Sequence, residues 1–582
     1  MLTAGCTTFC DLNATTSDPS LVPLGETTEM VETTTSSTVP CSPEIARSVR
    51  RRRRNRWTGL VPSPVLVVAF LAWLNCANAL SGIARSASPT KPTISACDDE
   101  TALLPPSVVV RIPEGIWREA ASDHRERIGT LLKPGLVGWD HPMMASISAS
   151  RKRKLRNKTK AQKRSNPNGI AAGDDATGPE ESDYDENSET TLTMLDHKHP
   201  VYNFLVEYYG LKGLKGPKRL ARWSPGVGVF FLGEEDSVSD SRTTTTPGSS
   251  TMSVRTIRSV NDYYKASELI AVAGEASLSH YIEDRGVFLE GATPDDFGGI
   301  LHLKDAQWID PSDADSHEYY GSQQGVLYRP RRTQRRDPTG LLWYRSVLDT
   351  TLANEPILYC YGLHEWAMQY HPEGAPPPPS GKYQAHLPLR VSRETINETV
   401  ERRGVSCTHV DALRFFAPAA APLNHHGATL ARTDQLSLEQ PACVHAHMDL
   451  LKIALKLTPY CDPSLLVDVL EVALEARTLD VGASPYDPKA YECPARTIPI
   501  IPVETPSGRA LYKKRQAALM EAARPIRSRL RDNLSAVLRL LHSDDQLERG
   551  ESNPSDERFA TATPGGKPWR KSLTDRPVGA RH

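Results

Sequence analysis

Long polar tracts interrupt this chain of 582 residues, and they limit how much of it can fold. Over residues 151–164 nine of fourteen side chains are Lys or Arg, and over residues 174–186 seven of thirteen are acidic. Such blocks cannot bury enough apolar surface to offset the conformational entropy lost on ordering. We therefore predict three disordered insertions, over residues 139–196, 235–258 and 311–338.

Apolar residues between these tracts recur mainly at helical spacing. Trp117, Ala120, His124 and Ile128 show this spacing in the first patterned segment, and it indicates an amphipathic helix. By the same pattern and by start and stop signals, further helices are predicted over residues 201–208, 341–352, 445–457, 465–479, 507–523 and 526–542. Gly482 is the expected stop of the fourth of these, and Pro525 is expected to separate the last two.

The predicted fold class is therefore mainly α, with a single helical domain over residues 105–545. Short buried or edge strands are expected over residues 357–361 and 387–391, the second limited to an edge by Pro388. The long disordered insertions interrupt this domain. Disordered tails are predicted at both ends, over residues 1–49 and 546–582.

A basic run followed by an apolar stretch precedes the domain. Arginines fill residues 50–54, residues 60–80 are mostly apolar, and Ala77 and Ala79 satisfy the small-residue rule for signal-peptide cleavage. Residues 50–80 are thus predicted to be a signal peptide or, if uncleaved, a signal anchor that contacts the membrane through residues 57–80. Residues 81–104 resemble a transit-peptide linker. We expect the secretory route, leading on to a complex plastid, with a single-pass membrane protein as the alternative.

Common catalytic and metal-binding fingerprints are absent from the sequence. It contains no CxxC pair, no H-E-x-x-H motif, no P-loop, and no GxSxG or GxGxxG motif. These absences argue against a zinc finger, a zincin, a nucleotide-binding fold and an α/β-hydrolase. The five cysteines beyond the leader are dispersed, which favours free thiols over a disulfide framework.

Three short segments place imidazole and carboxylate groups in otherwise apolar sequence. They are His364-Glu365, the segment CTHVD over residues 407–411, and the segment CVHAHMD over residues 443–449. Such groups in core-like sequence indicate a metal or acid–base site, or else a buried polar network whose members satisfy one another. Both interpretations remain open at this level.

The helix predicted from His445 onward carries a narrow polar stripe. At 100° per residue, His445, Asp449, Lys452 and Lys456 fall within about 60° of one another, whereas His447 points elsewhere. Most other positions are apolar, so the helix is expected to be largely buried. The stripe then either lines a cavity or is the narrow face of a buried helix that is exposed to solvent.

Specific roles follow from these segments. His364, His445 and Asp449 are the predicted metal ligands, a donor set that suits a divalent metal as the cofactor. His409, Asp411 and Glu365 are the predicted catalytic residues, because imidazole and carboxylate groups serve as general acids and bases. Two residues in turns, Trp223 and Arg509, are the predicted cofactor- or ligand-binding positions.

The patterned part of the chain also resembles a bacterial family of shorter proteins labelled 3-methyladenine DNA glycosylase. The resemblance follows the same order along the chain and covers most of the expected ordered part. It implies base excision, with Asp411 or Glu365 as the carboxylate that activates water. The matching stretches are residues 117–128, HPVYNFL at 199–205 with Tyr208-Tyr209, RWSPG at 222–226, GLHEWAM at 362–368, residues 407–416, residues 439–449 and ASPYD at 483–487.

Three functions follow from the sequence. The first is a small-molecule enzyme of hydrolase or lyase type with a His/Asp/Glu site and a divalent metal. The second is a DNA glycosylase acting on organellar nucleic acid, and the third is a non-catalytic cofactor-binding or structural protein. A metal site requires His364, His409 and His445 to converge within ~5 Å around one cavity, close enough for ligands of one metal.

Overall fold

The computed structural model describes residues 108–138, 144, 192–232, 253–272, 285–297, 299–303, 306–309, 324–329, 337–375, 386–542 and 547. All of them belong to one unit, which spans Thr101–His582. The predicted N-terminal tail, signal segment and transit-like linker (residues 1–104) lie outside the described residues. So does the predicted C-terminal tail, apart from residue 547. Within the described part of the chain, no helix has the length and apolar character needed to cross a membrane.

The fold is mainly α, as predicted. The described residues contain twelve α-helices: α2 (Glu114–Leu132), α4 (Asn203–Glu207), α5 (Lys215–Ala221), α6 (Val260–Val272), α9 (Thr339–Ala353), α10 (Leu363–Gln369), α11 (Arg393–Arg403), α12 (Val410–Leu413), α13 (Gln435–Leu438), α14 (Val444–Leu457), α15 (Pro463–Ala483) and α16 (Pro506–Leu541). Short 3-10 turns are η1 (Lys133–Gly135), η2 (Gly228–Phe231), η3 (Pro294–Asp296), η4 (Ala421–Leu423), η5 (Arg432–Asp434) and η6 (Lys489–Tyr491).

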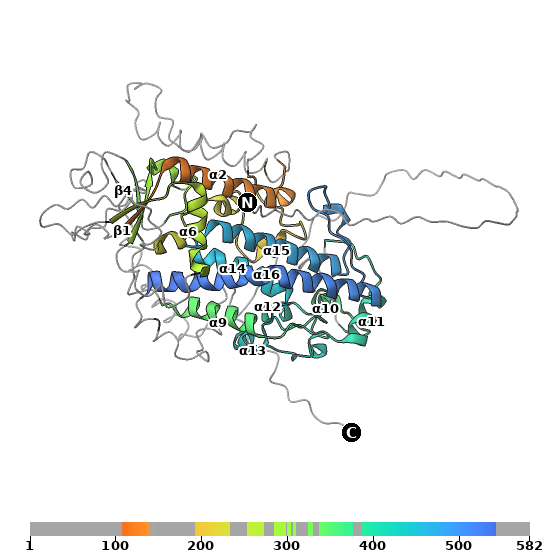
Figure 1. Cartoon of the computed structure of the whole chain (residues 1–582). Helices are drawn as coiled ribbons and strands as arrows, with labels where there is room; N and C mark the ends of the chain where they lie inside the picture. The colour runs from red at the N-terminus through yellow and green to blue at the C-terminus, as the bar shows by residue number, and fades with distance from the viewer. Residues whose placement is uncertain are drawn as a thin grey trace, which may run out of the picture. The chain divides into compact units, whose positions relative to one another are not determined.

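Three long helices form the centre of the domain. Figure 1 shows α14, α15 and α16 side by side, with α2 beyond α15 and α9 beyond α16. Most residues of α15 are buried, because it packs against α2, α14 and α16. A helix apolar around most of its girth must be covered in this way. The main hydrophobic core lies between these helices and extends to the sheet.

One mixed five-stranded sheet, in the order β2-β1-β3-β5-β4, lies at one end of the domain. β1 (Val108–Ile112) pairs in parallel with β2 (Ser253–Thr256) and with β3 (Arg285–Glu290). β5 (Gly325–Tyr328) is antiparallel to β3 and to β4 (Ala306–Ile309). The sheet thus joins segments that are far apart in the sequence.

The predicted strands and insertions need correction. Residues 357–361 form no strand, and residues 387–391 contribute only an isolated bridge from Leu389 to Tyr486. All three predicted insertions are shorter than expected, because residues 192–196 belong to the fold and β2 and β5 fall inside the other two ranges. Each of these strands is four residues long and gains its stability from distant partners, which local composition does not reveal.

The helix boundaries also differ from the prediction. Pro525 does not divide two helices but lies inside the continuous helix α16. Its exposure allows water to satisfy the carbonyl that the proline ring leaves without a helical partner. The helix predicted over residues 201–208 is limited to Asn203–Glu207, and α15 continues through Gly482 to Ala483.

The glycine inside α15 makes a testable prediction about packing. A Cβ at Gly482 would lie 2.5 Å from the Pro499 carbonyl oxygen, so Gly482→Ala should lower the free energy of unfolding by about 1–3 kcal/mol. The matched control is Gly129→Ala in α2, where a Cβ meets open space and helix propensity should add about 0.5–1 kcal/mol. Urea unfolding measures both. A Gly482→Ala variant as stable as the wild type would contradict the close approach.

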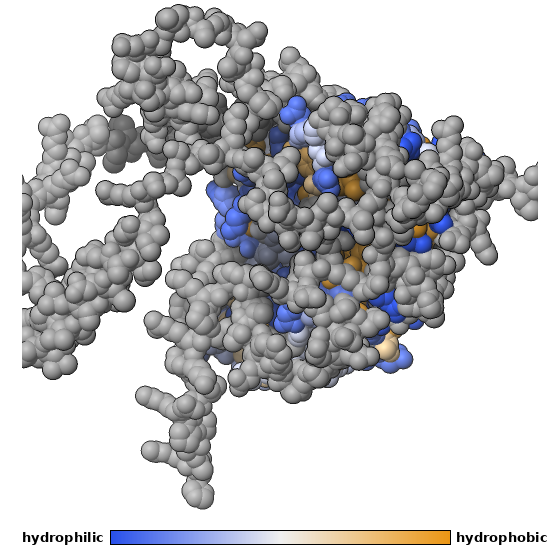
Figure 2. Space-filling model, turned by 90° about the vertical axis from the view of Figure 1, so that its left-hand side faces the viewer, coloured by the Kyte–Doolittle hydropathy of each residue, from blue (hydrophilic) through white to orange (hydrophobic). Residues whose placement is uncertain are grey.

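The surface seen in Figure 2 shows hydrophilic clusters and smaller, separate hydrophobic patches among the described residues. The large hydrophobic side chains that are exposed in the described part are Tyr208, Trp308, Tyr359 and Leu511. Scattered apolar residues of this kind are normal on a folded domain. The search for a site therefore turns to the buried polar groups.

Candidate metal centre

The three histidines singled out in the sequence meet inside the helical domain. The ring centroids of His364 and His445 lie 4.5 Å apart, and those of His409 and His445 lie 4.9 Å apart. His445 is thus between the other two. The three rings are therefore neighbours, but the atoms that could bind a metal fall into two groups, one with His364 and His445 and the other with His409.

Local structure aims His364 at this point. Tyr361 has a φ of 51° and Gly362 a φ of 67°, so the chain turns sharply just before α10 begins. A positive φ is uncommon for a residue with a side chain and often marks a functional turn. A Cβ at Gly362 would lie 3.3 Å from the Cβ of Ala483. The turn therefore brings the first residues of α10 against the end of α15.

His409 and His445 are positioned by other elements. His409 is the N-cap residue of α12, and the loop before it is tied by Asn424, whose side chain bonds both the N–H and the carbonyl of Cys407. His445 is the second residue of α14. The apolar remainder of α14 is buried, and this fixes the direction of its polar stripe.

His364, His445 and Asp480 form what we call the inner donor set. One ligand atom from each lies within 4.8 Å of the other two, a limit that includes the ~3.4 Å between the ligands of a tetrahedral metal with bonds of about 2.1 Å. His364 Nε2 is 2.8 Å from Asp480 Oδ1, an ion-pair contact, and neither atom has a further hydrogen-bond partner among the described residues. A metal bound here would displace the proton that lies between these two atoms.

The Asp480 carboxylate is anchored through its other oxygen. Arg477 NH1 donates to Asp480 Oδ2 and also contacts Glu365 Oε1 at 2.7 Å, while Arg477 Nε donates to the Pro200 carbonyl at 3.1 Å. These contacts hold Asp480 and leave its Oδ1 directed at His364, as outer partners of metal ligands do. Glu365, predicted to be catalytic, therefore lies one contact away from the inner donor set.

His409, Asp411 and Asp449 are the second group with metal-ligand spacing. With Arg414, Arg432 and Lys452 they form what we call the outer charge cluster. His409 Nε2 is 3.4 Å from Asp449 Oδ2, Lys452 Nζ is 3.0 Å from the same oxygen, and Arg432 donates to Asp411 at 2.8 Å. Arg or Lys side chains contact both oxygens of Asp411 and the Asp449 oxygen nearest His409, whereas Asp480 Oδ1 contacts His364. The outer charge cluster is therefore less suited to a metal than the inner donor set.

The structure separates Asp449 from the other two predicted ligands. Asp449 was expected to join His364 and His445, but the structure groups it with His409 and Asp411, and Asp480 takes the expected place. The reason is geometric: four residues of helix separate His445 from Asp449 by about 6 Å along the axis. Each side chain therefore contacts a different neighbouring element.

Burial and neighbouring charges set the protonation states. Burial, reinforced by His364 and His409, holds the pKa of His445 well below its usual value, so this ring is neutral and can act as a ligand. Burial opposes charge on His364, but Asp480 outweighs it and raises the His364 pKa. Burial likewise opposes ionisation of Asp411, while His409, Lys452 and Arg432 lower its pKa to about 2.

The polar stripe of α14 connects this centre with solvent. The side chain of His409 is 2% exposed, that of Asp449 15% and that of Lys452 19%, and Lys456 one turn further is exposed. On α14 itself, His445, Asp449 and Lys452 are half-buried and Lys456 is exposed. The stripe therefore meets solvent at Lys456, and its first residue lies beside His364 and His409.

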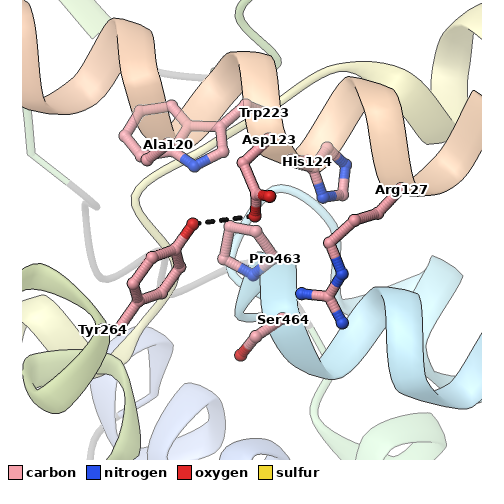
Figure 3. A pocket seen from close by; sticks show the side chains of 8 residues that line it. All are labelled: Ala120, Asp123, His124, Arg127, Trp223, Tyr264, Pro463 and Ser464. Atoms are coloured by element: carbon pink, nitrogen blue, oxygen red, sulfur yellow. Dashed lines mark hydrogen bonds between the residues drawn. The ribbon is translucent and has the colours of Figure 1, made fainter. Parts of the chain in front are cut away.

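The two predicted cofactor-binding residues lie elsewhere. Trp223 lines a small pocket with His124 and Arg127 of α2 and with Pro463 at the start of α15 (Figure 3). Arg509 donates to the backbone carbonyls of Val503 and Glu504 at the start of its own helix. Neither residue contributes to the histidine centre. Arg509 ties the first turn of α16 to the segment before it, and Thr505 is the N-cap of this helix.

Sequence reasoning missed Arg477 and Asp480, although a signal was present. Both are buried in α15, where Glu471 and Glu475 are exposed. At 100° per residue they lie roughly 140–200° around the helix from Glu475, on the apolar face. Opposite charges three residues apart on an apolar face indicate a buried polar site.

Comparison of the chain with family models, with curated proteins and with solved structures finds no match. The resemblance to bacterial proteins labelled as glycosylases therefore stays a prediction. A functional proposal has to rest on the geometry of the centre itself.

Proposed function

We propose that this protein is a metal-dependent enzyme of the hydrolase type that acts on a small molecule, with His364, His445 and Asp480 as ligands of a divalent metal. The observation that carries the proposal is the inner donor set, in which α10, α14 and α15 bring two imidazoles and one carboxylate together. Three ligands of this kind are typical of catalytic zinc sites, which leave a coordination position for water or substrate. A metal there supplies Lewis-acid catalysis and lowers the pKa of a bound water.

His409 is the proposed general acid–base. It lies next to His445, with Asp449 Oδ2 at 3.4 Å and Glu439 Oε2 at 3.8 Å from its Nε2. Flanking carboxylates orient an imidazole and stabilise its protonated form. Asp411, paired with Arg432 and Lys452, organises the outer charge cluster rather than taking up a proton.

A purely structural polar network fits His445 poorly. Within the described part of the chain, its ring has aromatic contacts with His364 and His409 but no hydrogen-bonding partner. His445 is half-buried, and burial together with His364 and His409 lowers the pKa of its ring. A metal ligand needs a free lone pair, which a neutral imidazole without a hydrogen-bonding partner has.

Cobalt substitution tests the proposal without knowledge of the substrate. We expect the full chain to bind an equimolar amount of Co²⁺ with visible absorption, and azide to alter the spectrum because a coordination position is open. Model esters such as p-nitrophenyl acetate should be hydrolysed only by the metal-loaded protein. His409→Gln should retain the metal and its azide response but lose turnover.

The control is His425→Gln, since His425 is exposed and outside the centre; it should behave as the wild type. A chain that binds no cobalt, or whose cobalt spectrum does not respond to azide, would contradict a catalytic metal centre. Excision of alkylated bases from DNA by a metal-free chain would instead favour the glycosylase alternative.

A further inference from the structure

Arg and Lys side chains match the carboxylates that they contact around the centre. In the described residues, four carboxylates pair with four Arg or Lys side chains; the carboxylates belong to Glu365, Asp411, Asp449 and Asp480, and the cations to Arg414, Arg432, Lys452 and Arg477. A divalent ion that displaces the proton of His364 still adds positive charge to this buried region. Excess charge in a region of low dielectric constant is costly unless an anion compensates it.

Two of these cations stand where the centre meets solvent. Lys452 and Arg432 are each 19% exposed, on α14 and on η5. Lys452 Nζ contacts Asp449 at 3.0 Å and Asp411 at 3.6 Å. Arg432 donates to Asp411 at 2.8 Å and to the Gln435 side chain at 3.2 Å. An ammonium has three N–H donors and a guanidinium has five, so both groups keep donors for a further acceptor.

The surroundings of these two cations fit a small ligand with an anionic group. Tyr209 donates its hydroxyl to Asp449 at 3.4 Å, and burial followed by Asp449 raises the pKa of Tyr209, so the hydroxyl stays protonated. Arg414 contacts Asp411 at 3.6 Å and lies over the Phe415 ring. Positive charge flanked by aromatic rings is therefore placed along the α14 stripe between solvent and His409.

We infer that the substrate carries an anionic group, a carboxylate or a phosphate, which Lys452 and Arg432 bind at the mouth of the metal centre. The inference rests on the proposed function, because the metal supplies the uncompensated positive charge. It adds the substrate class: a small anionic molecule whose reacting bond reaches inward to the metal while its charged end stays with Lys452 and Arg432.

Calorimetric titration of the zinc-loaded full chain with inorganic phosphate, and separately with acetate, tests this inference. The wild type should bind phosphate, acetate or both. The anion that binds more tightly indicates whether the substrate carries a phosphate or a carboxylate group. Lys452→Gln and Arg432→Gln should each weaken anion binding by ~10-fold or more, the effect of losing one charge-assisted hydrogen bond. Lys452→Arg keeps the positive charge and should retain anion binding. This variant therefore separates loss of the charge at residue 452 from a disturbance of the fold.

The matched control is Lys514→Gln, at an exposed position of α16, which should leave anion affinity unchanged. Zinc stoichiometry should stay the same in all these variants, because none of them alters the inner donor set. Unchanged anion affinity in both Gln variants, or no binding of either anion to zinc-loaded protein, overturns the inference and leaves the metal site intact. Failure of the wild type to bind zinc overturns the proposed function and this inference with it.

Discussion

Replacing His445 by Ala is expected to weaken zinc binding at least ~100-fold, since even the outer partners of metal ligands contribute 10–100-fold to affinity. His445 is the central imidazole of the three, 4.5 Å from the ring of His364 and 4.9 Å from that of His409. Its removal leaves one imidazole and one carboxylate in the inner donor set. Competition with a chromophoric chelator measures the affinity directly.

His425→Ala is the matched control for this experiment, because His425 is an exposed histidine outside the centre. It should bind zinc as the wild type does. Equal zinc affinity in the two variants would show that His445 is not a ligand. A comparison of the folded fractions by circular dichroism separates loss of a ligand from loss of the fold.

Replacing Arg477 by Met is expected to lower the free energy of unfolding by about 3–5 kcal/mol, the usual cost of leaving buried charge uncompensated. Arg477 is 8% exposed and contacts both Glu365 and Asp480. Without it, two buried carboxylates lose their cation and Asp480 loses its anchor. Urea unfolding in the presence of a chelator measures the effect free of any contribution from bound metal.

Arg529→Met is the control, because Arg529 pairs with Asp468 at 2.6 Å where the two side chains are 30% and 24% exposed. An exposed pair of this kind contributes about 1 kcal/mol or less. Adding Glu365→Gln to Arg477→Met should restore part of the lost stability, since one unpaired charge is removed. Similar losses of unfolding free energy in Arg477→Met and Arg529→Met would mean that the buried ion pairs of Arg477 stabilise the fold no more than an exposed pair does.

Local periodicity explains which parts of the fold were predictable. The helices α2, α9, α14 and α15 carry their apolar pattern within one segment, and each was expected near its observed position. The sheet was not, because β1 pairs with strands that begin at Ser253 and Arg285. β1 therefore depends on partners more than one hundred residues away, and no local pattern encodes that pairing.

The site was predictable in part for a similar reason. Histidines in apolar sequence are easily noticed, and the rings of His364 and His409 both lie beside that of His445. Their division into two donor groups could not be read from the sequence. The partner carboxylate was not predictable in the same way, because Asp449 shares a helix with His445 whereas Asp480 reaches the site from α15. Helix geometry gives the direction of a side chain but not the neighbour that it meets.

X-ray absorption of the full chain loaded with an equimolar amount of zinc tests the central claim most directly. A mononuclear centre of His364, His445 and Asp480 predicts two imidazole ligands, a carboxylate oxygen and a lighter exchangeable ligand, with bonds of about 2.0–2.1 Å. The Asp480→Asn variant should lose that spectrum. Thiolate ligands at about 2.3 Å, or zinc that keeps its imidazole ligands when His364 and His445 are both replaced, would contradict this assignment.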